Sequence, residues 1–206
     1  DDGVGRVVRG AVRVVAESDH LAADGGRLLG AAPRQALARL HTAAAADLVA
    51  SDQLGRPRQE QEAPVDDTVL AGVPAPTGAA LASRLAALVS VVTSSSAAPA
   101  LVLAAVAHAE VLLVRPFVAG NGIVARGLSR AVVIGRGLDP MGAAVPELAL
   151  LADPAGYRCG LDGYRSGTPE GVAAWLRFAA ETVVKGAEQG TQVADAVLVG
   201  RLPQEG

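Results

Sequence analysis

One short segment of the chain carries residues that can do chemistry: residues 115–126, which read RPFVAGNGIVAR. Gly120, Asn121 and Gly122 stand where one predicted helix ends and the next begins. Glycine allows positive φ and close approach of the backbone to a ligand, and the first N–H groups of a helix carry a partial positive charge. Arg126, one turn into the next helix, adds a guanidinium that can pair with a phosphate. The pattern indicates an anion site, and an ordinary helix–loop–helix turn is the alternative.

The same segment resembles the motif of the Fic (Fido) family, HPFx[D/E]GNGRxxR, in register over its whole length. The shared residues are Pro116, Phe117, Gly120, Asn121, Gly122 and Arg126. Flanking residues 107–110 and 136–140 are also similar to the family, and the resemblance covers roughly residues 35–145. It implies an all-α helical bundle in which the motif loop joins two central helices. It also implies a nucleotide whose phosphates bind this loop, and transfer of AMP from ATP to a protein hydroxyl.

Three positions depart from the family motif, and the resemblance assigns the chemistry to them. Arg115 replaces the general-base histidine, and a guanidinium stays protonated and cannot accept a hydroxyl proton. Ala119 replaces the acidic Mg²⁺ ligand and offers no oxygen to a hard cation. Ile123 replaces the first motif arginine and removes a phosphate donor. We therefore expect no catalytic residue in the motif and no metal site.

The resulting hypothesis is a degenerate Fic-family protein that acts as a binding or regulatory pseudoenzyme. Its ligand is a phosphate or a nucleotide such as ATP, bound without Mg²⁺, and a protein partner fits this role. The expected phosphate-binding residues are Gly120, Asn121, Gly122, Arg126 and Arg115. Enzyme activity stays open, because the alternative is a nucleotidyl- or phosphoryl-transferase that modifies a protein hydroxyl by a metal-free route. A helical domain that keeps the loop only for its turn geometry is a third hypothesis.

Other titratable residues give weaker signals. His108 lies two turns before the motif in an apolar helix, where we expect a packed core histidine rather than a relocated base. We expect Glu110 to pair with an arginine rather than to bind a metal. His20 and His41 show no ligand spacing, and the single cysteine, Cys159, excludes an internal disulfide.

The elements that must position the motif are helices. Hydrophobic spacing, Pro and Gly predict helices over 4–23, 33–50, 77–93, 99–114, 123–136 and 169–188, with short helices and turns over 138–167. Gly25 and Gly26 are expected to end the first helix. The region 51–76 is a predicted loop with one extended segment near 65–70. Its Pro-rich part, 56–72, should form no regular hairpin and bind an extended peptide weakly.

The last helix begins at a capping signal. Thr168 followed by Pro169 is typical of a helix start. Residues 166–171 also fit, by letter, the inhibitory-helix pattern of the Fic family, but the helix start is the preferred interpretation. Any inhibitory helix is then expected before Asp1, because the chain does not open with Met and we expect it to be processed or truncated there.

Composition supports a helical fold. Half of the 206 residues are hydrophobic but only 2% are aromatic, so the core consists of Ala, Val and Leu, which suits packed helices better than a β-sandwich. The most buried residues are expected to include Leu103, Val106, Ala107, Leu113 and Phe117. A net charge of −3 argues against nucleic acid as a partner. The apolar stretch 97–114 contains His and Glu, so we interpret it as a buried helix and expect no membrane contact.

These observations predict one domain over residues 1–206. Its Fic-like core is expected at about 35–145, with a C-terminal helical extension at 146–206. No signal peptide opens the chain, so we expect a cytoplasmic protein. The sequence gives no oligomeric state.

Overall fold

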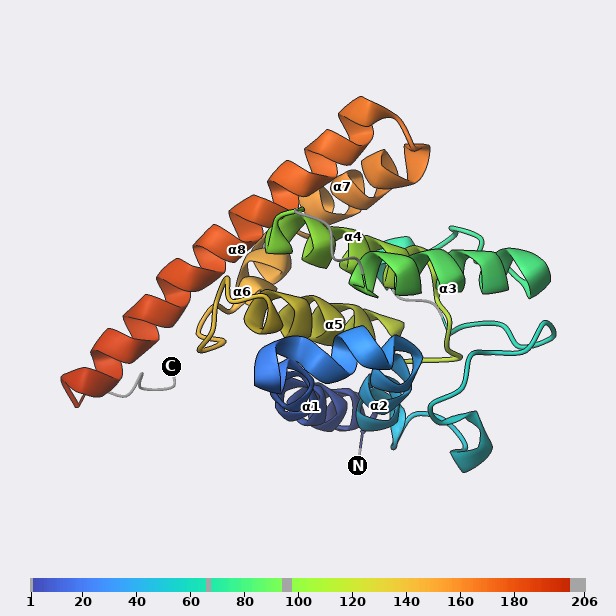
Figure 1. Cartoon of the computed structure of the whole chain (residues 1–206), viewed down its shortest axis with the longest axis horizontal. Helices are drawn as coiled ribbons and strands as arrows, with labels where there is room; N and C mark the ends of the chain where they lie inside the picture. Colours follow the sequence, from blue (N-terminus) through green and yellow to red (C-terminus); the bar gives the residue numbers. More distant parts are fainter. Residues whose placement is uncertain (1, 66–67, 94–97, 201–206) are drawn as a thin grey trace. The chain divides into compact units, whose positions relative to one another are not determined.

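The structure is a computed structural model that describes residues 2–65, 68–93 and 98–200. Within these residues every regular element is a helix, so the predicted all-α fold is confirmed (Figure 1). The helices are α1 (Gly3–Ala31), α2 (Pro33–Ala45), α3 (Gly78–Thr93), α4 (Ala100–Val114), α5 (Asn121–Gly135), α6 (Pro146–Ala152), α7 (Pro154–Ser166) and α8 (Pro169–Leu198). Two short 3-10 turns, η1 (Ser51–Gln53) and η2 (Thr68–Leu70), lie in the loop after α2. The elements form two compact units, Asp1–Pro140 and Met141–Gly206.

The first unit is built around α5. This helix packs against α1, α2 and α4, and α4 also packs against α3. Most residues of α4 and α5 are buried, and the motif loop joins these two helices as the sequence predicts. The position of the loop is therefore set by the best-packed part of the unit.

Small residues let these helices approach closely. A Cβ added to Gly127 of α5 would collide with Val14 of α1, and one added to Gly10 would collide with the carbonyl of Ala44 in α2. Because this unit contains a single aromatic residue, Phe117, its helices must come close for Ala, Val and Leu to fill the interior.

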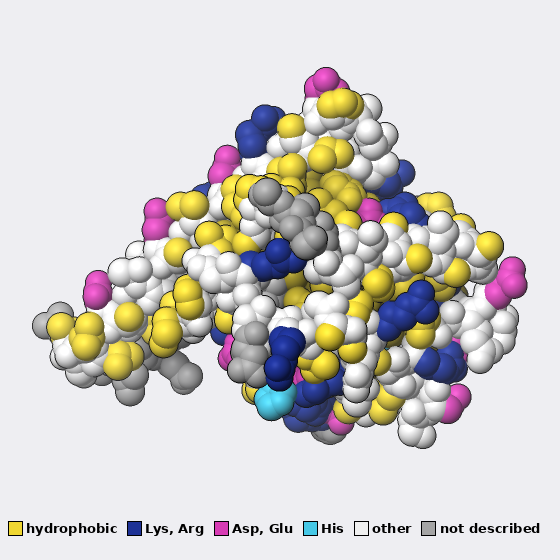
Figure 2. All heavy atoms as spheres, in the orientation of Figure 1, with side chains coloured by type: hydrophobic (Ala, Val, Ile, Leu, Met, Phe, Trp, Pro, Cys, Tyr) yellow, Lys and Arg dark blue, Asp and Glu magenta, His cyan; other side chains and the backbone are white. Residues whose placement is uncertain are grey.

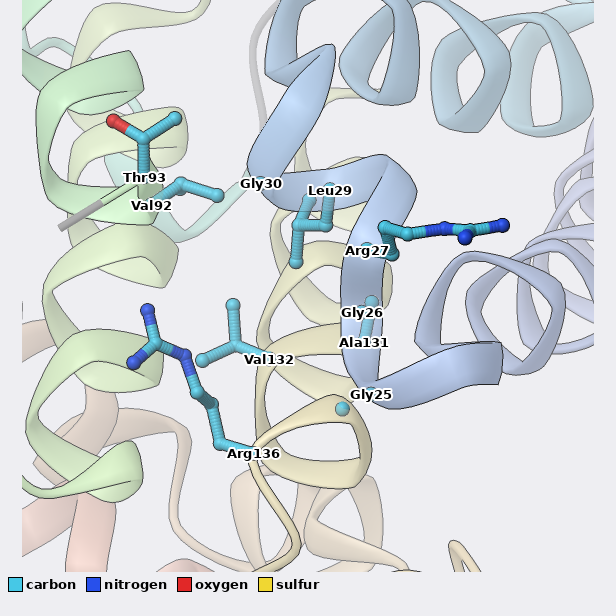
Figure 3. A pocket seen from close by; sticks show the side chains of 11 residues that line it. Gly25, Gly26, Arg27, Leu29, Gly30, Val92, Thr93, Ala131, Val132 and Arg136 are labelled. Carbon is cyan, nitrogen blue, oxygen red and sulfur yellow. The ribbon is translucent and has the colours of Figure 1, made fainter. Parts of the chain in front are cut away.

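Two predicted helix ends in this unit are wrong. Gly25 and Gly26 do not end α1, which continues to Ala31. Both glycines have positive φ, 68° and 73°, which glycine tolerates, so α1 changes direction there instead of stopping (Figure 3). α2 ends at Ala45 rather than near residue 50, because the N–H of Leu48 bonds the Ala45 carbonyl in a tighter turn.

The loop after α2 and the core each differ from the prediction in one respect. The predicted extended segment near 65–70 contains the 3-10 turn η2, while residues 66–67 lie outside the described residues.

Four of the predicted core residues are buried, but Val106 is only half-buried because it lies on a less covered face of α4. The buried four are Leu103, Ala107, Leu113 and Phe117.

The second unit is described up to residue 200 and contains α6, α7 and α8. Its helix α8 starts as predicted: the Thr168 hydroxyl accepts from the N–H of Gly171 at 3.1 Å, and Pro169 occupies the first turn. The helix extends to Leu198, about three turns past the predicted end at residue 188. Residues 166–171 thus form the junction of α7 and α8. Tyr157, Trp175 and Phe178 stack with centroids 6.1–6.2 Å apart.

On the face shown in Figure 2, basic side chains lie in separate groups among acidic and apolar ones. In the described parts of the chain, no helix combines the length and apolar character that a membrane span requires.

Candidate functional site

The motif loop begins and ends at residues in the left-handed region. Arg115 (φ 44°) ends α4, and its N–H bonds the carbonyl of Val111 at 2.9 Å. Gly120 (φ 77°) precedes α5. Among the described residues, Arg115 is the only one other than glycine with positive φ. Such a conformation is costly for a residue with a Cβ and persists only where its surroundings hold it.

Groups from distant segments of the chain surround Arg115. Its side chain is buried, with 1% exposure, and its guanidinium donates to the carbonyl of Val73. Its own carbonyl accepts from Nε of Arg58 at 2.8 Å. The structure therefore directs this guanidinium toward a backbone acceptor in the segment after η2.

The side chain of Asn121 holds the loop closed. Its Oδ1 accepts from the N–H of Phe117 at 3.0 Å, and its Nδ2 donates to the carbonyl of Phe117 at 2.8 Å. Asn121 is buried, so no solvent competes for these bonds. A bond from this residue to an anion can come from its backbone N–H or from the second hydrogen of Nδ2.

A buried histidine supports the loop from α2. The ring of His41 stacks on that of Phe117, and its Nδ1 accepts from the N–H of Gly55 at 2.9 Å. Nε2 therefore carries the proton. Burial lowers the pKa of His41 to about 4, and a smaller interaction with the backbone of Ala119 acts in the opposite direction. The imidazole is neutral near pH 7 and acts as a spacer between α2, Gly55 and the loop.

Sequence reasoning missed this role for His41. The sequence did contain a signal, because the apolar residues Leu37, Leu40 and Ala44 lie at helical spacing around His41. All three are buried, so this spacing would have placed His41 on the core side of α2.

The start of α5 supplies backbone donors. The first N–H groups of an α-helix have no acceptor within the helix, and the N–H of Val124 bonds the carbonyl of Gly120 at 3.0 Å. The N–H groups of Asn121, Gly122 and Ile123 precede this bond. A Cβ on Gly120 would make only ordinary contacts with the side chains of α2, at 3.5 Å, so glycine suits this position through its φ of 77°.

Arg126 lies farther along α5 and is half-buried. Burial, and next the charge of Arg126, lower the pKa of His108 to about 3, so this guanidinium lies near α4. His108 is a buried core residue, as expected. Arg130, one turn on, pairs with Asp19 at 2.9 Å.

Glu110 pairs with an arginine, as predicted. Nε and Nη2 of Arg84 donate to its carboxylate at 2.8–3.0 Å and join α3 to α4. Within the described residues, no three His, Cys, Asp or Glu side chains come together in an arrangement that could hold a metal.

The segment before η2 touches the motif loop directly. The N–H of Arg58 bonds the carbonyl of Pro116 at 2.7 Å, and the N–H of Val65 bonds that of Val118 at 2.6 Å. No strand is present in the described residues between 56 and 72, which agrees with the predicted lack of a regular hairpin. The affinity of this segment for an extended peptide stays a prediction.

A cavity of about 340 Å³ lies in the first unit, at the opposite end of α5 from the motif loop (Figure 3). It is lined by Gly25, Gly26, Arg27, Leu29, Gly30, Val92, Thr93, Ala131, Val132, Gly135 and Arg136. The side chain of Arg136 points toward Val92 and Thr93, whereas that of Arg27 points away. No motif residue lines this cavity.

Comparisons with known proteins agree with the motif and the fold. The model of the Fic/DOC family matches residues 32–132, from the start of α2 into α5. Among solved structures, the chain is similar to Fic-1 (residues 134–508) from C. elegans, with 17% identity and a TM-score of 0.69. The match covers 93% of this chain and 52% of that one, so the chain spans about half the length of its neighbour. At this identity the likeness shows the fold. No curated protein matches the sequence.

Proposed function

This chain belongs to the Fic/DOC family through residues 32–132, and we propose that it is a degenerate member that binds a phosphate-bearing ligand without transferring AMP. The observation that carries this proposal is the placement of Arg115, which stands where the motif has its base. Arg115 is 1% exposed and donates to the carbonyl of Val73. A buried, protonated guanidinium cannot remove a proton from a substrate hydroxyl.

The two other altered positions support the same proposal. Ala119 and Ile123 are both buried and apolar. Mg²⁺ takes oxygen ligands, and neither side chain offers one. The loop thus lacks the side chains that would hold a metal beside transferring phosphates.

The proposed ligand is a phosphate group, free or carried by a nucleotide such as ATP. Backbone N–H groups of Asn121, Gly122 and Ile123 supply donors at a helix start, where the dipole favours negative charge. The guanidinium of Arg126 is the nearest motif cation along α5 and is half-buried. We propose that Arg115 contributes by fixing the loop, since its guanidinium bonds Val73.

A metal-free transferase is the weaker candidate. Such an enzyme needs a base that a substrate can reach. The histidines near the loop, His41 and His108, are 0% and 7% exposed. Both are core residues, so we propose a binding or regulatory role rather than catalysis.

The transferase question is tested by mass spectrometry. The protein is incubated with ATP and Mg²⁺, and AMP adducts on the chain and on added proteins are measured. We expect none from the wild type. Arg115→His, Ala119→Asp and Ile123→Arg together should restore weak auto-modification if the scaffold still aligns the nucleotide. Robust Mg²⁺-dependent transfer by the wild type would overturn the pseudoenzyme assignment.

The ligand question is tested by calorimetry with inorganic phosphate, ADP and ATP, each with and without Mg²⁺. Arg126→Gln should weaken binding about tenfold, the size expected for one charge-assisted hydrogen bond. Arg130→Gln is the matched control, because Arg130 lies one turn on and already pairs with Asp19. Equal affinities for the two variants would remove Arg126 from the site. No binding at millimolar concentration would refute the phosphate proposal.

A further inference from the structure

We propose that residues 51–65 form a strap that closes over the motif loop and that the Glu62 carboxylate locks this strap in place. The inference concerns contacts within the chain, so it stands whether or not the loop binds phosphate. The strap begins at η1 and ends at Val65, where the described part of the segment ends.

The strap bonds one carbonyl after another along the loop. The N–H of Arg58 donates to Pro116 at 2.7 Å, and the N–H of Val65 donates to Val118 at 2.6 Å. Nε of Arg58 donates to the carbonyl of Arg115 at 2.8 Å. Three loop carbonyls are thus occupied by the chain's own strap, which shields the stretch before Gly120.

Arg58 anchors the middle of the strap. It is only 4% exposed, and its remaining donors bond the carbonyls of Glu62, at 3.3 Å, and Pro76. Burial, and next the charge of Arg115, lower the pKa of Arg58, with Glu62 acting in the opposite direction. The strap therefore cannot lift without moving a buried guanidinium back into water.

Glu62 folds the strap onto itself. Its carboxylate accepts from both terminal nitrogens of Arg56, at 2.7 and 2.8 Å, and from the N–H of Gln59 at 2.6 Å. Nε2 of Gln53 adds a bond at 3.1 Å. All of these donors belong to the strap, so the Glu62 carboxylate joins Gln53, Arg56 and Gln59 to the later part of the strap.

The first half of the strap is fixed on α2. Gly55 has φ 70°, and its N–H bonds Nδ1 of His41. A Cβ on Gly55 would lie 3.1 Å from the hydroxyl of Thr42, so the backbone rests directly on the helix. The strap is held on α2 at Gly55 and on the motif loop at Val65, which bonds Val118. Loss of the Glu62 bonds therefore frees the segment between Gly55 and Val65, which contains Arg58.

Trypsin measures this opening. Cleavage after Arg58 requires its buried side chain to enter the protease pocket, while Arg56 precedes Pro57 and resists cleavage. We compare Glu62→Gln with Glu60→Gln, an exposed residue two positions away with the same change in charge. Under native conditions, Glu62→Gln should raise the rate of cleavage after Arg58 about tenfold or more, because hydrogen bonds to a charged acceptor are the strong ones. Glu60→Gln should leave the rate unchanged.

Hydrogen exchange gives a second readout. The amides of Arg58 and Val65 should exchange faster in Glu62→Gln, while the amide of Val124 inside α5 keeps its rate. If Glu62→Gln does not fold, Arg56→Gln removes the opposite partner and gives the same comparison. Equal cleavage rates and equal exchange at residues 58 and 65 in the wild type and the variants would overturn the lock. A rise in all amides together would show global destabilisation and would also refute a local strap.

Discussion

The rings of His41 and Phe117 lie stacked, with centroids 3.9 Å apart and planes that differ by 3°. This contact joins α2 to the motif loop, and both side chains are buried. The backbone of Phe117 also makes two hydrogen bonds with the side-chain amide of Asn121: its N–H donates to Oδ1, and its carbonyl accepts from Nδ2. The loop is thus held by the stack of His41 on Phe117 and by the two hydrogen bonds between Asn121 and Phe117, which we call the amide clamp.

Phe117→Ala should lower the free energy of unfolding by about 3–5 kcal/mol, because it removes a buried ring and leaves a cavity against His41. Urea unfolding followed by far-UV circular dichroism measures this. Val118→Ala, next in the chain and half-buried, is the control and should cost about 1 kcal/mol or less. Similar losses in both variants would contradict a special role for the stack.

Asn121→Ala should cost about 2–4 kcal/mol, since it leaves both backbone groups of Phe117 buried without partners. The expected sign of local damage is faster hydrogen exchange at the Phe117 amide than at amides in the middle of α4. A variant as stable as the wild type would show that water replaces the clamp.

The stability of the protein should fall in mild acid. Burial lowers the pKa of His41 to about 4 from 6.5. Between these values the unfolded chain binds more protons than the folded one. Stability present above pH 6.5 is therefore lost as the pH falls toward 4, by about 1.4 kcal/mol per unit for one histidine. His108, with its pKa lowered to about 3, acts in the same direction.

Urea unfolding at pH 7.5, 6 and 5 checks this dependence. His41→Gln should flatten the profile, whereas His20→Gln, at an exposed position, should leave its slope as in the wild type. A wild-type profile that is flat over this range would show that neither buried histidine resists protonation.

Gly127→Ala should destabilise the protein by about 1–3 kcal/mol, because the new methyl group meets Val14, Ser18 and Leu40 in a packed helix crossing. Gly30→Ala is the matched control: this exposed α1 glycine has nothing within 4 Å of an added Cβ and no positive φ. It should be neutral or stabilising by up to about 1 kcal/mol. The thermal midpoints of the two variants should shift in opposite directions, or only Gly127→Ala should shift.

Local signals account for the parts of the fold that sequence predicted well. Pro99, Gly137 and the Thr168–Pro169 pair mark helix ends that the structure places within a residue or two. Glu110 was predicted to pair with an arginine, because a buried acidic residue in an apolar helix needs a partner for its charge. Capping and burial act over a few residues, so spacing alone reveals them.

The remaining features depend on distant contacts. The direction of the Arg115 guanidinium is set by Val73, and the strap is set by carbonyls more than fifty residues away. No periodicity encodes these partners. The Gly25–Gly26 pair failed as a stop signal because α1 resumes after the bend and packs on α5, so tertiary packing outweighed the local preference.

The scarcity of aromatic residues has an optical consequence. Both tyrosines and the only tryptophan lie at positions 157, 164 and 175, all within Met141–Gly206. Intrinsic fluorescence therefore reports one compact unit alone, while far-UV dichroism sees the helices of both. Melting curves recorded with the two signals on the same sample will coincide if the units unfold together and separate if they do not. The natural tyrosines and tryptophan therefore serve as a fluorescent probe of the second unit, and no added label is needed.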